Sequence, residues 1–421
     1  MIQHAFCVST LTHIEPFAMP VGNVPVLHGV LSTYQENTLK QEKITLRQFI
    51  DLEKIDTDTK ILVYSDTTWF TVCMLQRLLS HCQSTGEVGK VCCDSKDWNE
   101  NMRSCVQGET YFALGIIKVS DLIEWSKIDF DANYWHSLPD IRFDWQLELA
   151  KPLELHPSMQ HAVKPMPMGA IMVYTVGHWI DVLRVNQLAL LEKAERVKWD
   201  WKYGSVWSKI TMVLGFIWKV RSLSPQTIAR RIGTIGKNCK IHPTAVIEAC
   251  EIGDNVEIGP FAVLRASVVL DGAKIEEHAT VNLSIVGSRA RVARYAMINL
   301  SVLMEEAFVS RGGGFQMCLF GKQSFVAVDA VMLDLSFGKT IQVEYKGKWI
   351  DSKEYFVGVC VGHKAVIGNA VRLNYGVSIP NEALLVANAD TLICDASAAE
   401  PNVPYRSKEK KVARIVSKNQ Q

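Results

Sequence analysis

Three kinds of residue in the second half of the chain could do chemistry. Arg311 is followed by Gly312, Gly313 and Gly314, and such a run lets a ligand or another backbone approach closely because no Cβ stands in the way. Further along, the carboxylate of Asp334 and the imidazole of His363 can take up a proton during catalysis. The run Arg311–Gly314, Gln316 and Asp334 together mark our first candidate site, and His363 is a separate candidate. The alternative for Asp334 is a turn residue that bonds its own backbone.

The segment after Asp334 carries a group of lysines. Residues 338–358 alternate as a β-hairpin does, with Ile341, Val343 and Tyr345 facing one side and Lys346-Gly347-Lys348 at the turn. Together with Lys339 and Lys353, these lysines give the hairpin a basic face. Such a face could meet phosphate groups of a nucleotide or a coenzyme, and a solvated surface is the alternative.

A six-residue repeat must position these side chains. Aliphatic residues recur at every sixth position from Ile235 to Leu385, with one-residue slips, and the clearest run is Val361, Ile367, Leu373, Ile379 and Leu385. This period is that of neither an amphipathic helix nor a half-buried strand. It predicts a parallel β-helix of hexapeptides, with the aliphatic residue inside a triangular coil. We expect Arg311–Gly314 to interrupt the repeat.

The first part of the chain alternates strand and helix patterns. Strands are predicted near 60–64, 90–93, 110–119 and 170–176, and helices near 71–83, 121–125 and 179–197. This order predicts a largely parallel sheet covered on both faces. Asp66 follows the first of these strands and, as a single aspartate in a turn, could cap backbone groups. Residues 129–168 show no periodicity, and we interpret them as a loop or insertion.

Composition excludes several classes of protein. The 421 residues are 48% hydrophobic and 21% charged with a net charge of +1, which is typical of a soluble globular protein and gives no electrostatic reason to bind nucleic acid. The first ten residues lack the pattern of a signal peptide, and the eleven cysteines form no CxxC pair. We therefore expect a cytoplasmic protein with reduced thiols.

The stretch 205–221 is strongly apolar but contains Lys209 and is shorter than the about 20 apolar residues that a membrane-crossing helix needs. A helix packed between two domains is our interpretation. The alternative is a helix lying on a membrane surface.

Two segments carry a resemblance to a known family. Residues 177–194, with Trp179, Asp181 and Asn186, resemble the Trp-Asp-Leu-x-x-x-Asn linker helix of sugar-1-phosphate nucleotidyltransferases, with one extra residue. The segment Met19–Leu27 is similar to their LPVANKPLLEH segment. With the repeat, the chain resembles the bifunctional N-acetylglucosamine-1-phosphate uridyltransferase/glucosamine-1-phosphate acetyltransferase family.

This resemblance implies a domain order. A degenerate nucleotidyltransferase-like α/β domain would occupy residues 1–176 and linker helices 177–230. A left-handed parallel β-helix would follow at 231–397, with a hairpin excursion at 338–358 and a basic tail at 398–421.

In the first domain of the family, a glycine-rich loop and Lys-Pro steps hold a nucleoside triphosphate. The first 30 residues here contain no such loop, and Glu15 replaces the lysine of one Lys-Pro step. We therefore expect this domain to keep the fold without the nucleotidyl transfer. Mg²⁺ would be needed only if the domain were active, with Asp66 as the candidate ligand.

In the β-helix of the family, a His deprotonates the acceptor amine and an Asn positions it. Gln316 occupies the His position and Asp334 follows where the Asn turn lies, so Asp334 or His363 would have to act as base. The resemblance implies a homotrimer that transfers an acyl group from acyl-CoA, expected to be acetyl-CoA, to a sugar phosphate or nucleotide sugar. The alternative is a catalytically silent protein that binds a nucleotide sugar or acts as a scaffold.

Overall fold

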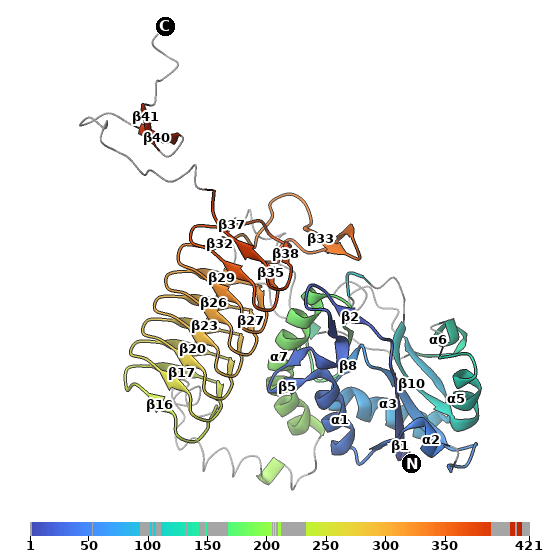
Figure 1. Ribbon diagram of the computed structural model, residues 1–421. Helices are drawn as coiled ribbons and strands as arrows, with labels where there is room; N and C mark the ends of the chain where they lie inside the picture. Colours follow the sequence, from blue (N-terminus) through green and yellow to red (C-terminus); the bar gives the residue numbers. More distant parts are fainter. Residues whose placement is uncertain are drawn as a thin grey trace.

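The computed structural model describes residues 2–52, 54–92, 102, 104–106, 111–130, 133–142, 148–149, 167–203, 205, 207, 209–211, 233–388, 405–408 and 411–414. An α/β domain, a long helix and a parallel β-helix follow one another along the chain (Figure 1). Most of the predicted helix 205–221 and of the tail lies outside the described residues. Among those described, no helix is long and apolar enough to cross a membrane.

The α/β domain is built on a six-stranded sheet with the order β11-β9-β10-β7-β1-β6. Its strands are β1 (His4–Val8), β6 (Thr45–Leu46), β7 (Lys60–Ser65), β9 (Gly89–Cys92), β10 (Tyr111–Lys118) and β11 (Asp140–Arg142). Only β10 runs against its neighbours in this sheet, so the predicted α/β class is confirmed. The interpretation of 129–168 as a loop was incomplete, because β11 is too short to show a period.

Both faces of this sheet are covered. Leu62 and Tyr64 of β7 lie in one hydrophobic core, and Ile61 and Val63 lie in the other, as the alternation of a strand requires. The helices are η1 (Val21–Asn23), α1 (Leu31–Gln41), α2 (Phe49–Leu52), α3 (Val72–Thr85), α5 (Val119–Ser126) and α6 (Asn133–Ser137). Short strand pairs are β2 (His13–Ile14) with β3 (Met19–Pro20), β4 (Pro25–Val26) with β5 (Gly29–Val30), β8 (Thr68–Phe70) with β14 (Val173–Thr175), and β12 (Glu148–Leu149) with β13 (Pro167–Met168).

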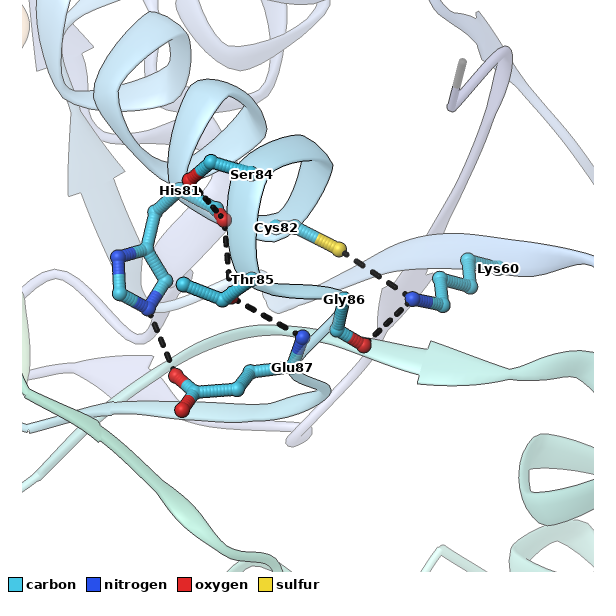
Figure 2. Close-up of polar contacts among 7 residues, drawn as sticks. All are labelled: Lys60, His81, Cys82, Ser84, Thr85, Gly86 and Glu87. Atoms are coloured by element: carbon cyan, nitrogen blue, oxygen red, sulfur yellow. Dashed lines mark hydrogen bonds and ion pairs between the residues drawn. The ribbon is translucent and has the colours of Figure 1, made fainter.

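The end of α3 shows how helices are fastened to this sheet (Figure 2). Gly86 ends the helix in the left-handed conformation at φ 75°, and its N–H donates to the Cys82 carbonyl at 2.9 Å. The ammonium group of Lys60, at the start of β7, donates to the Gly86 carbonyl at 2.6 Å. A positive charge at the C-terminal end of a helix also interacts favourably with the helix dipole. His81 and Glu87 form a polar contact of 2.8 Å beside it.

The β-helix consists of three faces of parallel strands. The first face contains β15 (Thr234–Ile235), β18 (Glu251–Ile252), β21 (Val268–Val269), β24 (Ile285–Val286), β27 (Val302–Leu303), β30 (Leu319–Phe320), β35 (Cys360–Val361) and β38 (Ser378–Ile379). The second contains β16 (Lys240–Ile241), β19 (Glu257–Ile258), β22 (Lys274–Ile275), β25 (Arg291–Val292), β28 (Phe308–Val309), β31 (Phe325–Val326), β36 (Val366–Ile367) and β39 (Leu384–Leu385). The third contains β17 (Val246–Glu248), β20 (Val263–Arg265), β23 (Thr280–Asn282), β26 (Met297–Asn299) and β29 (Gly314–Gln316), followed by the pair β32 (Val331–Met332) and β37 (Arg372–Leu373).

Strand pairing explains the slips in the six-residue repeat. Thr234 pairs with Glu251, and Glu251 pairs with Val268, so stacked positions are 17 residues apart. One coil therefore advances by six, six and five residues. Glycines keep stacked coils close at one corner, since a Cβ on Gly236 would lie 2.5 Å from the Gly253 carbonyl carbon. The prediction of a parallel β-helix is confirmed.

The first face is apolar on both sides from β21 to β35. Its inward residues fill the core of the β-helix, and its outward residues in these five strands are at most 2% exposed because they pack against the α/β domain. These outward residues are Val268, Ile285, Val302, Leu319 and Cys360. Helix α7 (Trp179–Tyr203) lies between the two domains (Figure 1), and Gln187 on it donates to the Leu300 carbonyl at 3.2 Å.

We call the contact between the α/β domain, α7 and the first face of the β-helix the joint. The two segments that carried the family resemblance meet beside it. Asn186 of α7 accepts from the Leu27 N–H at 2.8 Å and donates to the Pro25 carbonyl at 2.8 Å. The fully buried Asp181 accepts from Ser104, from Tyr174 and from two backbone N–H groups. Asp181 and Asn186 thus fix the position of α7 on the α/β domain.

The excursion folds as the hairpin β33 (Gln342–Tyr345) and β34 (Lys348–Asp351) and closes over the same joint. Its two turn residues, Lys346 and Gly347, have φ 50° and 74°, as a type I′ turn requires. Ile341 and Val343 are fully buried with residues of the α/β domain. Arg184 of α7 pairs with Glu354 at 3.1 Å, so the hairpin clasps the two domains together.

We predict that Glu251→Gln destabilises the joint in a pH-dependent way. Hydrogen bonds from His28 and Lys193 lower the pKa of Glu251 from 4.5 to about 2. A carboxyl with a lowered pKa stabilises the folded state above its ordinary pKa and loses that contribution as the pH falls from about 4.5 to about 2. The side chain is 30% exposed, so we expect a loss of only about 1–2 kcal/mol at pH 7.

Urea unfolding of both proteins between pH 7 and pH 2.5 measures this difference. It should shrink toward zero as the pH falls. A difference that is absent at pH 7, or that does not change with pH, contradicts the assignment.

Candidate functional site

The polar site of the β-helix lies where the third face ends and the excursion begins. Asn299 and Gln316 occupy paired positions on β26 and β29, and the Asn299 amide donates to the Gln316 side-chain oxygen at 2.8 Å. The Gln316 side chain lies close enough to the Asp334 carboxylate to lower its pKa. Gln316 and Asp334, which the sequence had singled out separately, are therefore brought together. Asn299 was missed, although its distance of 17 residues from Gln316 was a usable signal.

Asp334 is the acidic group of this site. Its side chain is half-buried, and burial raises its pKa, while hydrogen bonds from its own backbone N–H and from Gln316 act in the opposite direction. The Asp334 carbonyl accepts from the Val357 N–H at 2.8 Å, so the corner is closed by the end of the excursion. A half-buried carboxylate with a raised pKa can accept a proton from an acceptor group.

Cys318 lies in the same coil but does not offer a nucleophile. It is fully buried, and burial raises the pKa of its thiol to about 12, with the nearby Asp334 adding to the effect. Its backbone N–H donates to Ser301 at 3.0 Å, as the Ser301 N–H donates to Ser284 one coil earlier. This thiol and these hydroxyls form an internal ladder that supports the corner.

The glycine run lies at the opposite edge of the third face. We expected it to interrupt the repeat, and this was wrong, because Met297 pairs with Gly314 and Ile298 with Phe315 in unbroken register. Gly313 makes room for Phe315, whose ring atom would lie 2.3 Å from a Cβ at that position. Gly312 has φ 75° and open space around it, and the exposed Arg311 lies beside it.

Gly312 occupies the next stacked position, one coil after a stack of three aromatic rings at the same corner. Phe261, His278 and Tyr295 stack with ring centroids 5.1 Å and 4.8 Å apart. All three adopt positive φ as Gly312 does, so this corner accepts large side chains. His278 is thus part of a surface stack.

The lysines of the excursion are exposed, as we expected for a basic face. Lys339, Lys346, Lys348 and Lys353 lie on the surface, and the Lys346 ammonium is 5.2 Å from the centroid of the Tyr345 ring. The excursion packs against the joint, so the backbone that carries these lysines has a fixed position.

His363 lies at another corner, at the far edge of the first face from Asp334. Its Nδ1 accepts from the Lys322 N–H at 2.9 Å, and its ring packs on Phe17 of the α/β domain at 4.7 Å. Burial and the cations of Lys322 and Lys364 lower its pKa. These contacts make His363 part of the contact between the two domains.

Asp66 lies at the end of β7, in the α/β domain. Its carboxylate accepts from the Thr10 N–H at 3.1 Å, from the Thr10 hydroxyl at 2.9 Å and from the Ser9 hydroxyl at 3.1 Å. No cluster of three or more His, Cys, Asp or Glu side chains that could hold a metal occurs among the described residues. The carboxylate thus caps the loop after β1.

We predict that Gly313→Ala and Gly314→Ala differ sharply in stability. A Cβ at 313 collides with the buried Phe315 ring, and overpacking of a core costs about 1–3 kcal/mol. A Cβ at 314 meets only the end of Met297 at 3.5 Å, so the change should stay within about 0.5 kcal/mol. Urea unfolding of the two variants tests this, and equal stabilities would refute the role of Gly313 in the core.

One family model and one solved structure are similar to parts of this chain. Residues 228–321 match the family model described as the GMPPB C-terminal domain. A crystallographic analysis of the polysialic acid O-acetyltransferase OatWY gives a solved structure similar over 45% of this chain and 92% of that one, at 16% identity and a TM-score of 0.17. No curated protein matches the chain. The matched domain and the observed β-helix fit the resemblance to the bifunctional uridyltransferase/acetyltransferase family.

Proposed function

We propose that this protein is a hexapeptide-repeat acyltransferase that works at the corner formed by Gln316 and Asp334. The observation that carries the proposal is the half-buried Asp334 carboxylate, which lies beside the Gln316 side chain at the end of the third face. The resemblance adds the substrates, which are acyl-CoA as donor, most simply acetyl-CoA, and a sugar phosphate or nucleotide sugar as acceptor.

In this reaction, an amine or hydroxyl of the acceptor attacks the thioester carbonyl of acyl-CoA. A new C–N or C–O bond forms, the C–S bond breaks, and the thiolate of CoA leaves. Asp334 takes the proton of the attacking group and can pass it to the thiolate, so protons and charges balance. Gln316 cannot take a proton at neutral pH, and it would orient Asp334 through its hydrogen bond.

Two observations favour Asp334 over His363 as the base. The Nδ1 atom of His363 already accepts a backbone hydrogen bond, and its ring is covered on one side by Phe17. Asp334 lies beside Gln316, and its side chain is only half-buried. The glycines and Arg311 at the other edge of this face, with Lys339, Lys346 and Lys348 of the hairpin, would contact the phosphate groups of donor or acceptor.

We also propose that the α/β domain has no nucleotidyltransferase activity and needs no Mg²⁺. The Asp66 carboxylate already accepts hydrogen bonds from the Ser9 hydroxyl and from the N–H and hydroxyl of Thr10. A bound triphosphate would need such donors for itself. Adding a sugar 1-phosphate, Mg²⁺ and any of the four ribonucleoside triphosphates should release no pyrophosphate. Pyrophosphate release that Asp66→Ala abolishes would overturn this proposal.

A homotrimer formed along the β-helix is the assembly we propose. With the first face occupied by the α/β domain, the remaining faces expose Met297, Val331, Leu333 and Phe337 near the candidate site. Exposed apolar groups of this kind mark surfaces that bind a partner. Light scattering should give the mass of three chains, and a monomer at micromolar concentration would contradict it.

The second candidate function is a catalytically silent protein that binds a nucleotide sugar or acts as a scaffold. The observations that favour it are Gln316 at the position of the catalytic His and the capped loop beside Asp66. In that case, ligands bind but no CoA is released.

We predict that Asp334→Asn lowers the turnover of acyl transfer about 10²- to 10⁴-fold with little change in folding, because the amide keeps the shape but cannot take a proton. The assay follows CoA thiol release from acetyl-CoA with a panel of amino-sugar phosphates and nucleotide sugars. Since burial raises the pKa of Asp334, the wild-type rate should rise with pH through this raised pKa and then level off.

The matched control is His363→Asn, whose side-chain oxygen can still accept from the Lys322 N–H and which should keep turnover near the wild-type value. A loss of turnover in this control but not in Asp334→Asn assigns the base to His363. Ligand binding without CoA release, unchanged by Gln316→His, supports the silent alternative.

A further inference from the structure

A cavity of about 430 Å³ lies between α1, the turn joining β4 to β5, and α7. This volume is within the range of about 300–1,000 Å³ that small-molecule pockets occupy. Val30, Val72 and Val197 form an aliphatic part of its lining, and Asn37 and Glu192 bring polar groups to it. The lining includes none of the residues that we assign to acyl transfer, so the cavity is a separate feature.

Glu192 is the unusual residue of this cavity. It is only 6% exposed, it lines the cavity, and it has no hydrogen-bond or ion-pair partner among the residues that the structure describes. Its neighbour Glu195 is equally buried but pairs with Lys198 at 2.5 Å. Because this carboxylate lines the cavity and hydrogen-bonds no described protein group, the donors that it needs must come from molecules in the cavity.

The cations around the cavity are already engaged. Arg196 donates to the Gln41 side-chain oxygen at 2.8 Å, and Lys193 pairs with Glu251 at 2.5 Å. Against these two cations, the lining carries the two carboxylates Glu192 and Asp200. This balance gives no net attraction for an anion such as a phosphate or for a cation such as a polyamine.

We propose that this cavity binds an uncharged monosaccharide, whose hydroxyl groups donate hydrogen bonds to Glu192. The aliphatic lining faces the C–H groups of the sugar ring, and the side chain of Asn37 supplies both a donor and an acceptor at the rim. The site does not depend on the proposed acyl transfer. A bound sugar would contact both the β4–β5 turn and α7, which are also joined through Glu251 by His28 and Lys193.

Isothermal titration of the full chain with glucose, mannose and N-acetylglucosamine tests the proposal, with glucose 1-phosphate and spermidine as charged comparators. At least one neutral sugar should bind more tightly than either charged molecule. Glu192→Gln should weaken that sugar about tenfold or more, since a hydrogen bond to a charged group contributes about 1.5–3 kcal/mol. Glu195→Gln, a change of the same kind outside the cavity, should leave the affinity unchanged.

Asn37→Trp provides a second variant in case Glu192→Gln does not fold, because residue 37 is exposed on α1 and a large ring there blocks the cavity. It should abolish sugar binding. The proposal is overturned if no neutral sugar binds at millimolar concentration, if a charged comparator binds more tightly, or if Asn37→Trp binds as the wild type does. Asp334→Asn should bind the sugar normally, which separates this test from that of acyl transfer.

Discussion

The structure depends on the burial of the outward side of the first β-helix face. Val268, Ile285, Val302 and Leu319 point away from the β-helix core and are nevertheless covered by the α/β domain. Fully burying a side chain of this kind contributes about 1.5–3 kcal/mol. Separating the two domains would expose the whole row at once, so the α/β domain, α7 and the β-helix form one unit. The contacts of Gln187, Arg184 and Lys193 add specificity to this apolar joint.

This joint determines which faces of the β-helix are open to other molecules. With the first face covered, the second and third faces remain available, and the third ends at the corner of Gln316 and Asp334. The excursion that leaves this corner is held by Arg184 and by the contact of His178 with the Glu344 carbonyl at 3.0 Å. The α/β domain therefore supports the site in the β-helix from a distance, while Asp66 caps its own loop after β1.

The repeat and the hairpin could be read from the sequence because both are local patterns. Period six follows from the inward residue of each short strand, and the alternation of Ile341 and Val343 follows from a strand with one buried side. The joint was missed although the sequence contains a signal for it. First-face strands such as Val268-Val269 have two consecutive apolar residues, so both of their sides are apolar. Second-face strands such as Lys274-Ile275 have a charged residue followed by an apolar one. The packing of Phe17 on His363 could not be predicted, because it joins segments that no pattern relates. The cavity beside Glu192 arises in the same way, from three separate elements.

A crystal structure with coenzyme A bound most directly tests the claim that the third face beside Asp334 is the working site. We predict that the thiol end of the coenzyme lies beside Asp334 and Gln316, with its phosphates toward Arg311 or the hairpin lysines. Coenzyme A in the α/β domain beside Ser9 and Asp66, or a third face that stays empty at a saturating concentration, would contradict this account.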